Sequence, residues 1–592
     1  MESAAPVTPH DVLNQSTPLS GHNVYTTDHA LRDALQFHAP QVDDRQRVRL
    51  GAMLGDEQMQ THARLANFHQ PRLHTHDRFG RRTDTVEFHP SYHALLGAAV
   101  GAGLHATPWL QGPDAHIQRA APQDGACMDR AGPQGGAHMD RAGPQGGAHM
   151  ERAAGFIMFT QLEPSVLCPV SMTYAVTPAL RGNAAVFGDW FDKLASTRYD
   201  PRLINVQAKS GVTMGMGMTE KQGGSDVRAN TTRAEFAQDT AWGRCYRLVG
   251  HKWFFSAPMC DAFLVLGQTP TGLSCFFLPR VLPDGGLNAI AIQRLKDKLG
   301  NHANASAEVE FNGALAWLVG EEGRGIPQIL EMGTLTRLDC ALGTAGLMRG
   351  AVALALHHSA QRSAFGKRLA DQPLMRNVLA DLAIESEAAT ALALRLARAI
   401  DRQDDPFEAL MRRVLTPVAK FWICKRGAAL AQEAMECLGG NGYVEDHGEG
   451  VMARIYREMP LNSIWEGAGN IMALDLLRAL RKRDGKGGDA VQALAAELDT
   501  ARGANALLDR FADALIARFD DAADGGGDEA GARRLAQDVA LAVQGSLLRR
   551  HAPDFVFEAF CRSRLGGDGP QVFGTLPAGV DFQSIIHRAH PA

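Results

Sequence analysis

A block of short strand-like runs lies between two long stretches of helical pattern, and this order restricts the folds open to the chain. Within residues 213–318, short apolar and β-branched runs alternate with turns. From about residue 325 to 480 the pattern changes to long amphipathic helices, and residues 1–112 and 153–199 are also mainly helical in pattern. The sequence therefore predicts an α+β protein with one β-domain between two helical domains. The clearest expected strands and helices are 245–249, 262–267, 273–278, 347–363 and 374–400.

Composition narrows the class of protein further. A chain of 592 residues with 45% hydrophobic and 21% charged residues is typical of a globular protein of three or four structural units. The chain contains no apolar run of eighteen residues and no signal-like N-terminus, so we expect no membrane association. Its nine cysteines are scattered without a C-x-x-C pair, which favours reduced thiols and a cytoplasmic location. A net charge of −5 predicts no general attraction to nucleic acid.

An insert near residues 115–152 contains three copies of an eleven-residue unit. The last two copies read Ala-Gly-Pro-Gln-Gly-Gly-Ala-His-Met-Asp/Glu-Arg, and their Gly-Pro and Gly-Gly pairs predict a surface loop. His138 and His149 share one repeat position, where Cys127 stands in the first copy. A metal site is conceivable there, but expansion of the repeat accounts for the coincidence more simply, and we expect no bound metal.

Two segments of the β-block carry groups suited to a flat ring with polar edges. Residues 216–225 read Met-Gly-Met-Thr-Glu-Lys-Gln-Gly-Gly-Ser, a turn whose Gly223 and Gly224 let the backbone approach a ligand. Residues 250–256 read Gly-His-Lys-Trp-Phe-Phe-Ser, a strand expected to present a flat aromatic face that ends at the hydroxyl of Ser256. Hydroxyls and backbone amides beside an aromatic wall suit a flavin. Each segment alone is more typical of an ordinary hairpin with an aromatic core.

Three segments of the C-terminal half extend the pattern. They are Arg-Ser-Ala-Phe-Gly at 362–366, followed by Gln372, then Leu-Gly-Gly-Asn-Gly-Tyr at 438–443 and Ile-Trp-Glu-Gly-Ala-Gly-Asn at 464–470. In order and spacing, the motifs of both halves resemble those of the acyl-CoA dehydrogenase family. Within that family, the chain resembles the AidB-like branch. The segments that carry this resemblance are residues 218–226, 295–301 and 456–466, the N-terminal Asn14-Gln15 with Pro18-Leu19, and the long tail after residue 480. The flavoproteins of this branch are associated with the adaptive response to DNA alkylation. The resemblance covers nearly the whole chain except the insert.

The resemblance implies FAD as a non-covalent cofactor. It places Arg362 and Gln372 at the adenosine-diphosphate end of FAD, across a subunit interface, because a planar guanidinium pairs well with phosphate oxygens. The alternative for these residues and for the glycine turn is a helix start and a helix C-cap. The residues that the resemblance assigns to FAD are Met216, Gly217, Met218, Thr219, Glu220, Lys221, Gln222, Gly223, Gly224, Ser225, Phe254, Phe255, Ser256, Arg362, Gln372, Gly439, Gly440, Ile464, Trp465, Glu466, Gly467, Ala468, Gly469, Asn470, Ile471, Met472, Ala473 and Leu474.

Glu466 is the expected catalytic base. By resemblance, a carboxylate in this segment removes the α-proton of an acyl thioester while the flavin accepts a hydride. The apolar neighbours Ile464 and Trp465 are consistent with the raised pKa that this task requires. The alternative is that Glu466 is present only because its segment binds flavin.

The tail after residue 480 is where the resemblance implies binding of double-stranded DNA. Residues 479–592 carry 14 Lys and Arg against 16 Asp and Glu, so only local basic clusters support this expectation. The candidates for phosphate contacts are Arg478, Arg481, Lys482 and Arg483, and an ordinary charged helix surface is the alternative.

These observations predict four units: a helical domain at 1–212, a β-domain at 213–320, a helical bundle at 321–480 and an extra helical region at 481–592. The expected function is that of an AidB-like flavoprotein, homo-oligomeric and by resemblance tetrameric, with DNA binding and weak acyl-CoA oxidation. Two alternatives stay open: a metabolic dehydrogenase for a branched, isovaleryl-CoA-like substrate, and a flavin-stabilised DNA-binding scaffold without catalysis.

Overall fold

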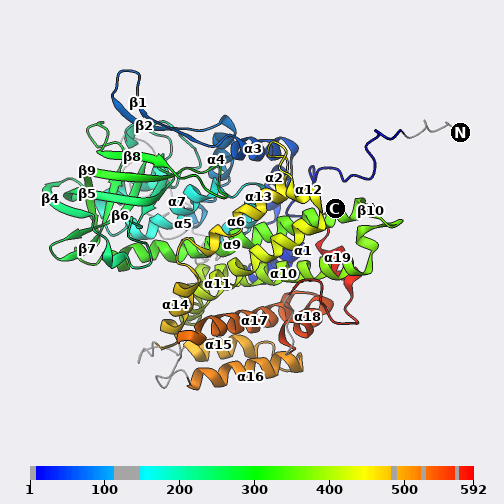
Figure 1. The fold of residues 1–592 in the computed structure, drawn as a ribbon. Helices are drawn as coiled ribbons and strands as arrows, with labels where there is room; N and C mark the ends of the chain where they lie inside the picture. Colours follow the sequence, from blue (N-terminus) through cyan, green and yellow to red (C-terminus); the bar gives the residue numbers. More distant parts are fainter. Residues whose placement is uncertain (1–7, 112–146, 482–489, 522–528, 567–571, 592) are drawn as a thin grey trace, which may run out of the picture.

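The computed structural model describes residues 8–111, 147–481, 490–521, 529–566 and 572–591, and places a β-domain at one end of a long helical bundle (Figure 1). The predicted order of helices, strands and helices is confirmed. Further helices from the C-terminal tail pack along the side of the bundle (Figure 1).

The N-terminal unit is helical, with one β-hairpin. The helix α1 (His29–His38) begins where the Asp28 side chain accepts a hydrogen bond from Leu31 N, an ordinary N-cap. The remaining helices are α2 (Arg45–Leu54), α3 (Glu57–Phe68), α4 (Pro90–Gly101), α5 (Thr107–Gln111), α6 (Ala148–Leu162), α7 (Leu167–Leu180) and α8 (Ala184–Leu194). Between α3 and α4, β1 (Arg72–His76) pairs with β2 (Arg82–Glu87) in a hairpin. The Asp77 carboxylate accepts from Phe79 N and Arg81 N and so forms the turn that joins the two strands.

Seven strands of the middle domain form one sheet that closes on itself, because β6 pairs with both β4 and β7. Two of its strands, β5 and β9, run side by side over most of their length and form the longest pairing in the sheet. The strands are β3 (Met214–Gly217), β4 (Arg233–Thr240), β5 (Gly243–Ser256), β6 (Ala262–Thr269), β7 (Gly272–Pro279), β8 (Ile290–Leu295) and β9 (Ser306–Val319). All three expected strands lie within β5, β6 and β7.

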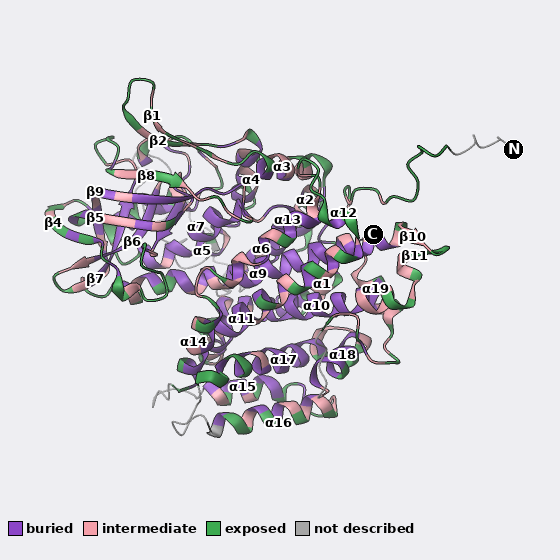
Figure 2. Cartoon of the chain, in the orientation of Figure 1, coloured by how far each residue is buried: buried purple, intermediate pink, exposed green. Residues whose placement is uncertain are grey.

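Three long antiparallel helices form the centre of the bundle. They are α9 (Gly325–Gln361), α10 (Pro373–Asp401) and α11 (Pro406–Cys437), and shorter segments follow them: α12 (Gly440–Tyr443), α13 (Val451–Glu458) and α14 (Gly469–Arg481). The start of α11 is fixed by Pro406 and by Asp405, whose side chain accepts from Phe407 N and Glu408 N. By length and hydropathy α9 could cross a membrane, but 89% of its apolar window is buried inside the protein (Figure 2).

The end of the repeat insert is helical, which corrects the expectation of a loop through residue 152. Residues 148–152 form the first turn and a half of α6. The Arg152 guanidinium is buried, forms a two-point ion pair with Asp339 on α9 at 2.6 and 2.7 Å, and lies 3.5 Å from the Tyr174 ring centre. Nδ1 of His149 lies 2.6 Å from the Tyr174 hydroxyl. These contacts stabilise a helix at residues whose composition suggested a loop. The rest of the insert, with His138, lies outside the described residues.

The tail is held to the bundle by buried ion pairs. Its described segments are α15 (Ala490–Asp499), α16 (Ala506–Asp521), α17 (Ala532–His551), α18 (Asp554–Phe560), a π-helical turn (Cys561–Leu565) and α19 (Phe582–Ala589). Arg564 contacts Asp381 and Glu385 on α10, and Arg395 on α10 contacts Glu497 on α15.

Candidate functional site

The turn after β3 and the end of β5 lie together, as their resemblance to flavin-binding segments implied. Trp253 N donates to Thr219 O at 2.9 Å, which joins the two segments directly. Residues 221–225 are exposed, whereas Met216 and Gly217 are buried. A Cβ at Gly217 would lie 2.5 Å from the Phe255 ring, so only glycine fits this close approach.

The Glu220 side chain holds the turn rather than facing a ligand. Its buried carboxylate accepts hydrogen bonds from Lys252 Nζ at 2.8 Å and from Thr231 N at 2.6 Å. Burial alone would raise the pKa of this carboxyl, but the Lys252 ammonium and the hydrogen bonds from Thr232 and Thr231 hold the pKa well below its usual range. The turn therefore offers a ligand its backbone, its hydroxyls and its exposed residues.

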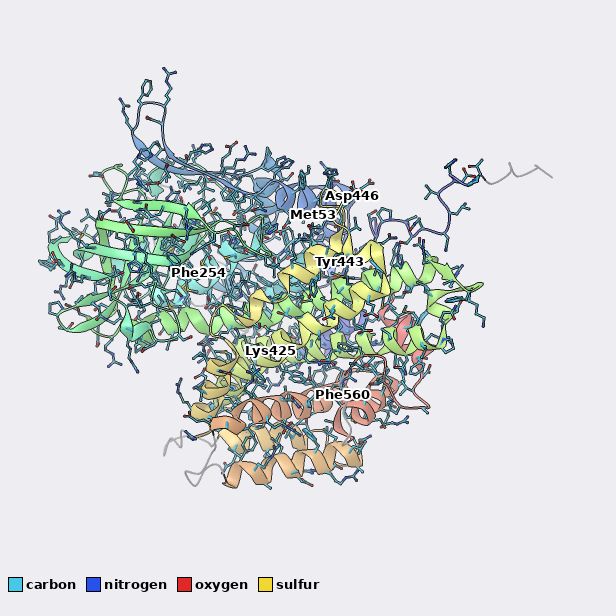
Figure 3. The ribbon with its side chains drawn as sticks, in the orientation of Figure 1. Met53, Phe254, Lys425, Tyr443, Asp446 and Phe560 are labelled. Carbon is cyan, nitrogen blue, oxygen red and sulfur yellow. The ribbon has the colours of Figure 1, made fainter. Side chains whose placement is uncertain are left out.

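The three aromatic residues of β5 do not form one flat face, which corrects the expected aromatic wall. Phe255 is buried against Phe263, whereas Phe254 is 54% exposed, on the side of the β-domain that faces the bundle (Figure 3). The Lys296 ammonium lies over the Trp253 ring, 3.4 Å from the ring centre. Successive side chains of a strand point to opposite faces, and a register shift between Lys252 and Phe255 turns this segment further.

Glu466 lies in a turn of unusual backbone that two cations hold in place. Its φ is +59°, a region that L-residues seldom adopt, and Gly467 follows at +103°. Lys420 Nζ donates to Trp465 O at 2.7 Å and to Gly467 O, and Arg337 Nε donates to Glu466 O at 3.0 Å. Three successive carbonyls of the turn are thus bound by two cations. A strained backbone conformation persists only where several contacts hold it, and these hydrogen bonds supply them.

The Glu466 carboxyl is half-buried and accepts one hydrogen bond, from Thr336 Oγ1 at 2.7 Å. Burial raises the pKa of this carboxyl, against the opposing effects of Thr336, Arg337 and Lys420. A carboxylate with a raised pKa at an open turn can act as a general base.

The remaining predicted residues of this segment divide between surface and core. Ile464, Ala468 and Asn470 are exposed, and Gly469 is buried at the start of α14. Met472 and Ala473 are buried, and Met472 packs against Gly467, so they support the turn from behind. Ile471 and Leu474 are partly buried against the core.

The β-domain and the Glu466 turn meet around Cys168 on α7. Burial raises the pKa of the Cys168 thiol to about 12, and Lys298, Glu466, Asn304 and Ser256 all lie near enough to influence it. Apart from this thiol, the buried amide of Asn304 has no polar partner among the described residues. An amide whose one described polar partner is a weakly hydrogen-bonding thiol, beside Ser256, fits a ligand with polar ring edges, as a flavin has.

Several residues of this site were not predicted from the sequence: Cys168, Asn304, Thr336, Arg337 and Lys420. Thr336 contacts Glu466 across 130 residues of sequence and Lys420 contacts Trp465 across 45, so no local pattern marks them. Lys298 lies within the segment 295–301 that the resemblance had singled out. It donates to Asn304 O at 2.5 Å and Ser306 Oγ at 3.2 Å, and burial lowers its pKa to about 8.

A second cluster of predicted residues lines a pocket at the far end of α9. Arg362, Gly439 and Gly440 share this pocket of about 370 Å³ with His358, Met375 and Asn441. Gly439 has a φ of +60°, and a Cβ there would meet no atom within 4 Å. Gln372 does not line the pocket; its Nε2 donates to Ala364 O at 2.9 Å and so holds the turn between β10 (Ser363–Ala364) and β11 (Lys367–Arg368).

Most basic side chains in the described part of the tail are paired within the protein. Arg549, Arg550 and Arg564 form ion pairs, Arg534 pairs with Asp538, and Arg562 donates to Ala578 O. Of the four predicted DNA contacts, Arg478 and Arg481 are exposed at the end of α14, while Lys482 and Arg483 lie outside the described residues.

Comparisons with known proteins agree with this architecture. Three family models match: "Adaptive response protein AidB N-terminal domain" at residues 14–124 and 125–201, "Acyl-CoA dehydrogenase, middle domain" at 215–314 and "Acyl-CoA dehydrogenase, C-terminal domain" at 323–481. The chain therefore belongs to the acyl-CoA dehydrogenase family, in its AidB-like branch. The acyl-CoA-dehydrogenase-like protein AidB of Escherichia coli (strain K12) is 49% identical over 80% of this chain and 81% of its own length.

Two solved structures have the same fold over most of the chain. The apo-form of Bd2924 covers 91% of this chain and 99% of its own, with a TM-score of 0.76 and 27% identity. Caenorhabditis elegans ACDH-11, solved in complex with C11-CoA, covers 99% of this chain and 93% of its own, with a TM-score of 0.75 and 24% identity.

Proposed function

We propose that this chain binds FAD and oxidises acyl-CoA thioesters slowly, as a cytoplasmic flavoprotein. The observation that carries the proposal is the Glu466 carboxyl, held on a strained turn and facing the same junction as Ser256 and the Asn304 amide. Family members are flavoproteins, and the Asn304 amide, which has only the Cys168 thiol as a described polar partner, fits the polar edge of a flavin together with the glycine turn and the Ser256 hydroxyl.

In such a reaction, the residues of the site have separate roles. FAD, when bound, accepts a hydride from the β-carbon of the acyl chain. Glu466 removes the α-proton, because its raised pKa makes the carboxylate a stronger base than an exposed glutamate. Lys420 and Arg337 hold the turn that carries the carboxylate, and Met472 and Trp465 limit the access of water from the protein side.

We propose further that the protein is a homo-oligomer, tetrameric as the resemblance implies, in which each Arg362 pocket serves the FAD of another copy. Thr336, which contacts Glu466, and His358, which lines the pocket, are twenty-two residues apart on α9, or roughly 33 Å along the helix axis. That distance exceeds the length of one extended FAD. Side chains of Phe365, Leu374 and Tyr443 are 97%, 83% and 77% exposed near the pocket, as expected of a surface that a second copy covers.

The direct test of the cofactor is reconstitution. The purified protein, supplied with FAD and passed through a desalting column, should remain yellow and show the visible absorption of bound flavin. A protein that stays colourless under these conditions would overturn the proposal.

A role in the response to DNA alkylation is the finer part of the proposal, and it includes non-specific binding of double-stranded DNA. The match to the AidB adaptive response domain supports it. We assign the contact to Arg478 and Arg481, with the residues that follow them, because both side chains are exposed at the end of α14.

The DNA contact is tested by its dependence on salt. Binding through phosphates should weaken steeply as salt rises and depend little on sequence. Replacing Arg478 and Arg481 by Gln should weaken it and reduce the log–log salt slope by roughly one unit for each phosphate that is no longer neutralised. Arg549→Gln, which removes an arginine already paired with Asp554 at the surface, should leave the slope unchanged. An absence of binding to duplex DNA at low salt would favour the metabolic dehydrogenase instead.

A further inference from the structure

The N-terminal residues 14–17, here called the strap, bind the turn that carries Arg362. The Asn14 side-chain amide forms two hydrogen bonds with the backbone of Ser363. Asn14 Nδ2 donates to Ser363 O at 2.8 Å, and Ser363 N donates to Asn14 Oδ1 at 2.7 Å. The Asn14 carbonyl also accepts a hydrogen bond from Arg362 Nη1. Asn14 has a φ of +54°, a conformation that asparagine tolerates better than most residues. Its side chain and its backbone are thus both fitted to this contact.

The rest of the strap reaches the other walls of the same pocket. Ser16 Oγ lies 2.9 Å from His358 Nδ1, and Thr17 N donates to Gln361 Oε1 at 2.8 Å, both at the end of α9. On the opposite wall, Asn441 Nδ2 donates to Gln15 Oε1 at 3.0 Å, directly after the glycine pair. Four successive residues therefore contact α9, the Arg362 turn and the glycine turn. Figure 1 shows the N-terminal trace leaving the body of the protein beside α12 and β10.

The strap holds Arg362 without neutralising it. Arg362 makes no ion pair with a carboxylate in the part of the chain that the structure describes, and its contact with the strap is to a neutral carbonyl. The guanidinium keeps its full charge and its other N–H donors, while one donor is fixed in direction. Glu436 also lines the pocket but forms no ion pair with Arg362, and a guanidinium that is fixed in direction and free of an ion pair is well suited to a phosphate group.

We propose that the strap is part of the cofactor site: it positions Arg362 and Asn441 to bind the diphosphate end of FAD. This inference rests on the proposed function, since it assigns residues to the same cofactor. It also gives a physical role to the Asn14-Gln15 pair, which lies far in sequence from every other predicted site residue.

The test measures FAD affinity and needs no turnover. Apoprotein is titrated with FAD, and the change in flavin fluorescence gives the Kd for the full-length wild type and for Asn14→Ala, Asn14→Asp and Gln15→Ala. Val12→Ala is the matched control, because Val12 is 85% exposed and lies two residues from the strap contact. We expect Asn14→Ala to raise the Kd roughly tenfold, since it removes the two side-chain hydrogen bonds that hold the Arg362 turn.

Asn14→Asp separates positioning from folding. The carboxylate keeps the acceptor for Ser363 N but places a negative charge beside Arg362, so we expect FAD binding at least as weak as in Asn14→Ala, and an unchanged melting temperature of the apoprotein. If the wild type itself does not bind FAD, the proposed function fails. If the wild type binds and both Asn14 variants match Val12→Ala, the strap inference is wrong. Weaker binding that accompanies dissociation of the oligomer in light scattering would assign the strap to subunit contacts and also overturn it.

Discussion

At the scale of single residues, the site depends on a backbone conformation that the Glu466 turn would not hold alone. Non-glycine residues at positive φ carry a cost of about 1 kcal/mol or more. Lys420 is 1% exposed and makes no carboxylate ion pair within the described residues, so its buried charge is satisfied by the carbonyls of Trp465 and Gly467. Lys420 thus fixes the turn and also favours the charged form of the Glu466 carboxyl.

Lys420→Met should lower stability and move the pH dependence of flavin reduction. Leaving two partly buried carbonyls without their donor should cost about 2 kcal/mol in the free energy of unfolding. Loss of the cation also disfavours the charged Glu466, so the rise of the reduction rate with pH should shift to higher pH. Lys425→Met is the control, because Lys425 is an exposed residue of the same helix (Figure 3). An unchanged pH profile in Lys420→Met would contradict this role.

At the scale of elements, the tail is held to the bundle by charges that are buried at the contact. Arg564 on the π-helical turn contacts Asp381 at 2.5 Å and Glu385 at 3.1 Å, and Arg426 on α11 contacts Glu385 at 2.9 Å. Without Arg564 the buried Asp381 would lose its ion-pair partner, whereas Glu385 would keep Arg426. The tail is therefore part of the folded body of the protein.

Arg564→Met should destabilise the protein by about 3 to 5 kcal/mol, the usual cost of leaving buried charges without a partner. Urea unfolding measures this, and limited proteolysis should release the tail first. Arg562→Met, two residues away and exposed, should change stability by no more than about 0.5 kcal/mol. Equal effects of the two variants would show that the buried pair does not hold the tail.

The same network makes tail docking sensitive to acid. Burial alone would raise the pKa of Glu385, but Arg426 and Arg564 outweigh it and lower the pKa from 4.5 to about 2. Since the folded-state pKa is depressed, the pair contributes its full stability above pH 4.5 and loses it as pH falls toward about 2. The stability difference between wild type and Glu385→Gln should therefore shrink as pH falls from about 5 to about 3. A difference that stays constant over that range would contradict the assignment.

Periodicity was sufficient to predict the long helices and the strands of the middle domain, because amphipathic patterns report directly on burial. It could not predict the start of α6, since the repeat composition favours a loop and only Asp339 and Tyr174, far along the chain, stabilise the helix. The aromatic wall was wrong because a strand alternates its faces and this one carries a register shift. The site residues that belong to short sequence motifs were predicted. Lys420 and Asn304 belong to no such motif and reach the site only through the fold, so the sequence carries no local signal for them.

At the scale of the whole molecule, the two predicted parts of the cofactor site lie at opposite ends of α9. The Glu466 turn faces the β-domain, and the Arg362 pocket lies at the far end among exposed apolar side chains. In the proposed homo-oligomer, the Glu466 turn of one copy and the Arg362 pocket of another contribute to the same cofactor site. This arrangement accounts for both the strap and the exposed residues around it.

The central claim is that Glu466 is the base of an FAD-dependent oxidation of acyl-CoA. Its most direct test is anaerobic mixing of FAD-loaded protein with a panel of straight and branched acyl-CoAs, followed by the loss of visible flavin absorption. The wild type should bleach slowly with at least one thioester, and Glu466→Gln should retain FAD but not bleach, because it keeps the size of the side chain and loses its basicity. Bleaching of Glu466→Gln at the wild-type rate would contradict the account.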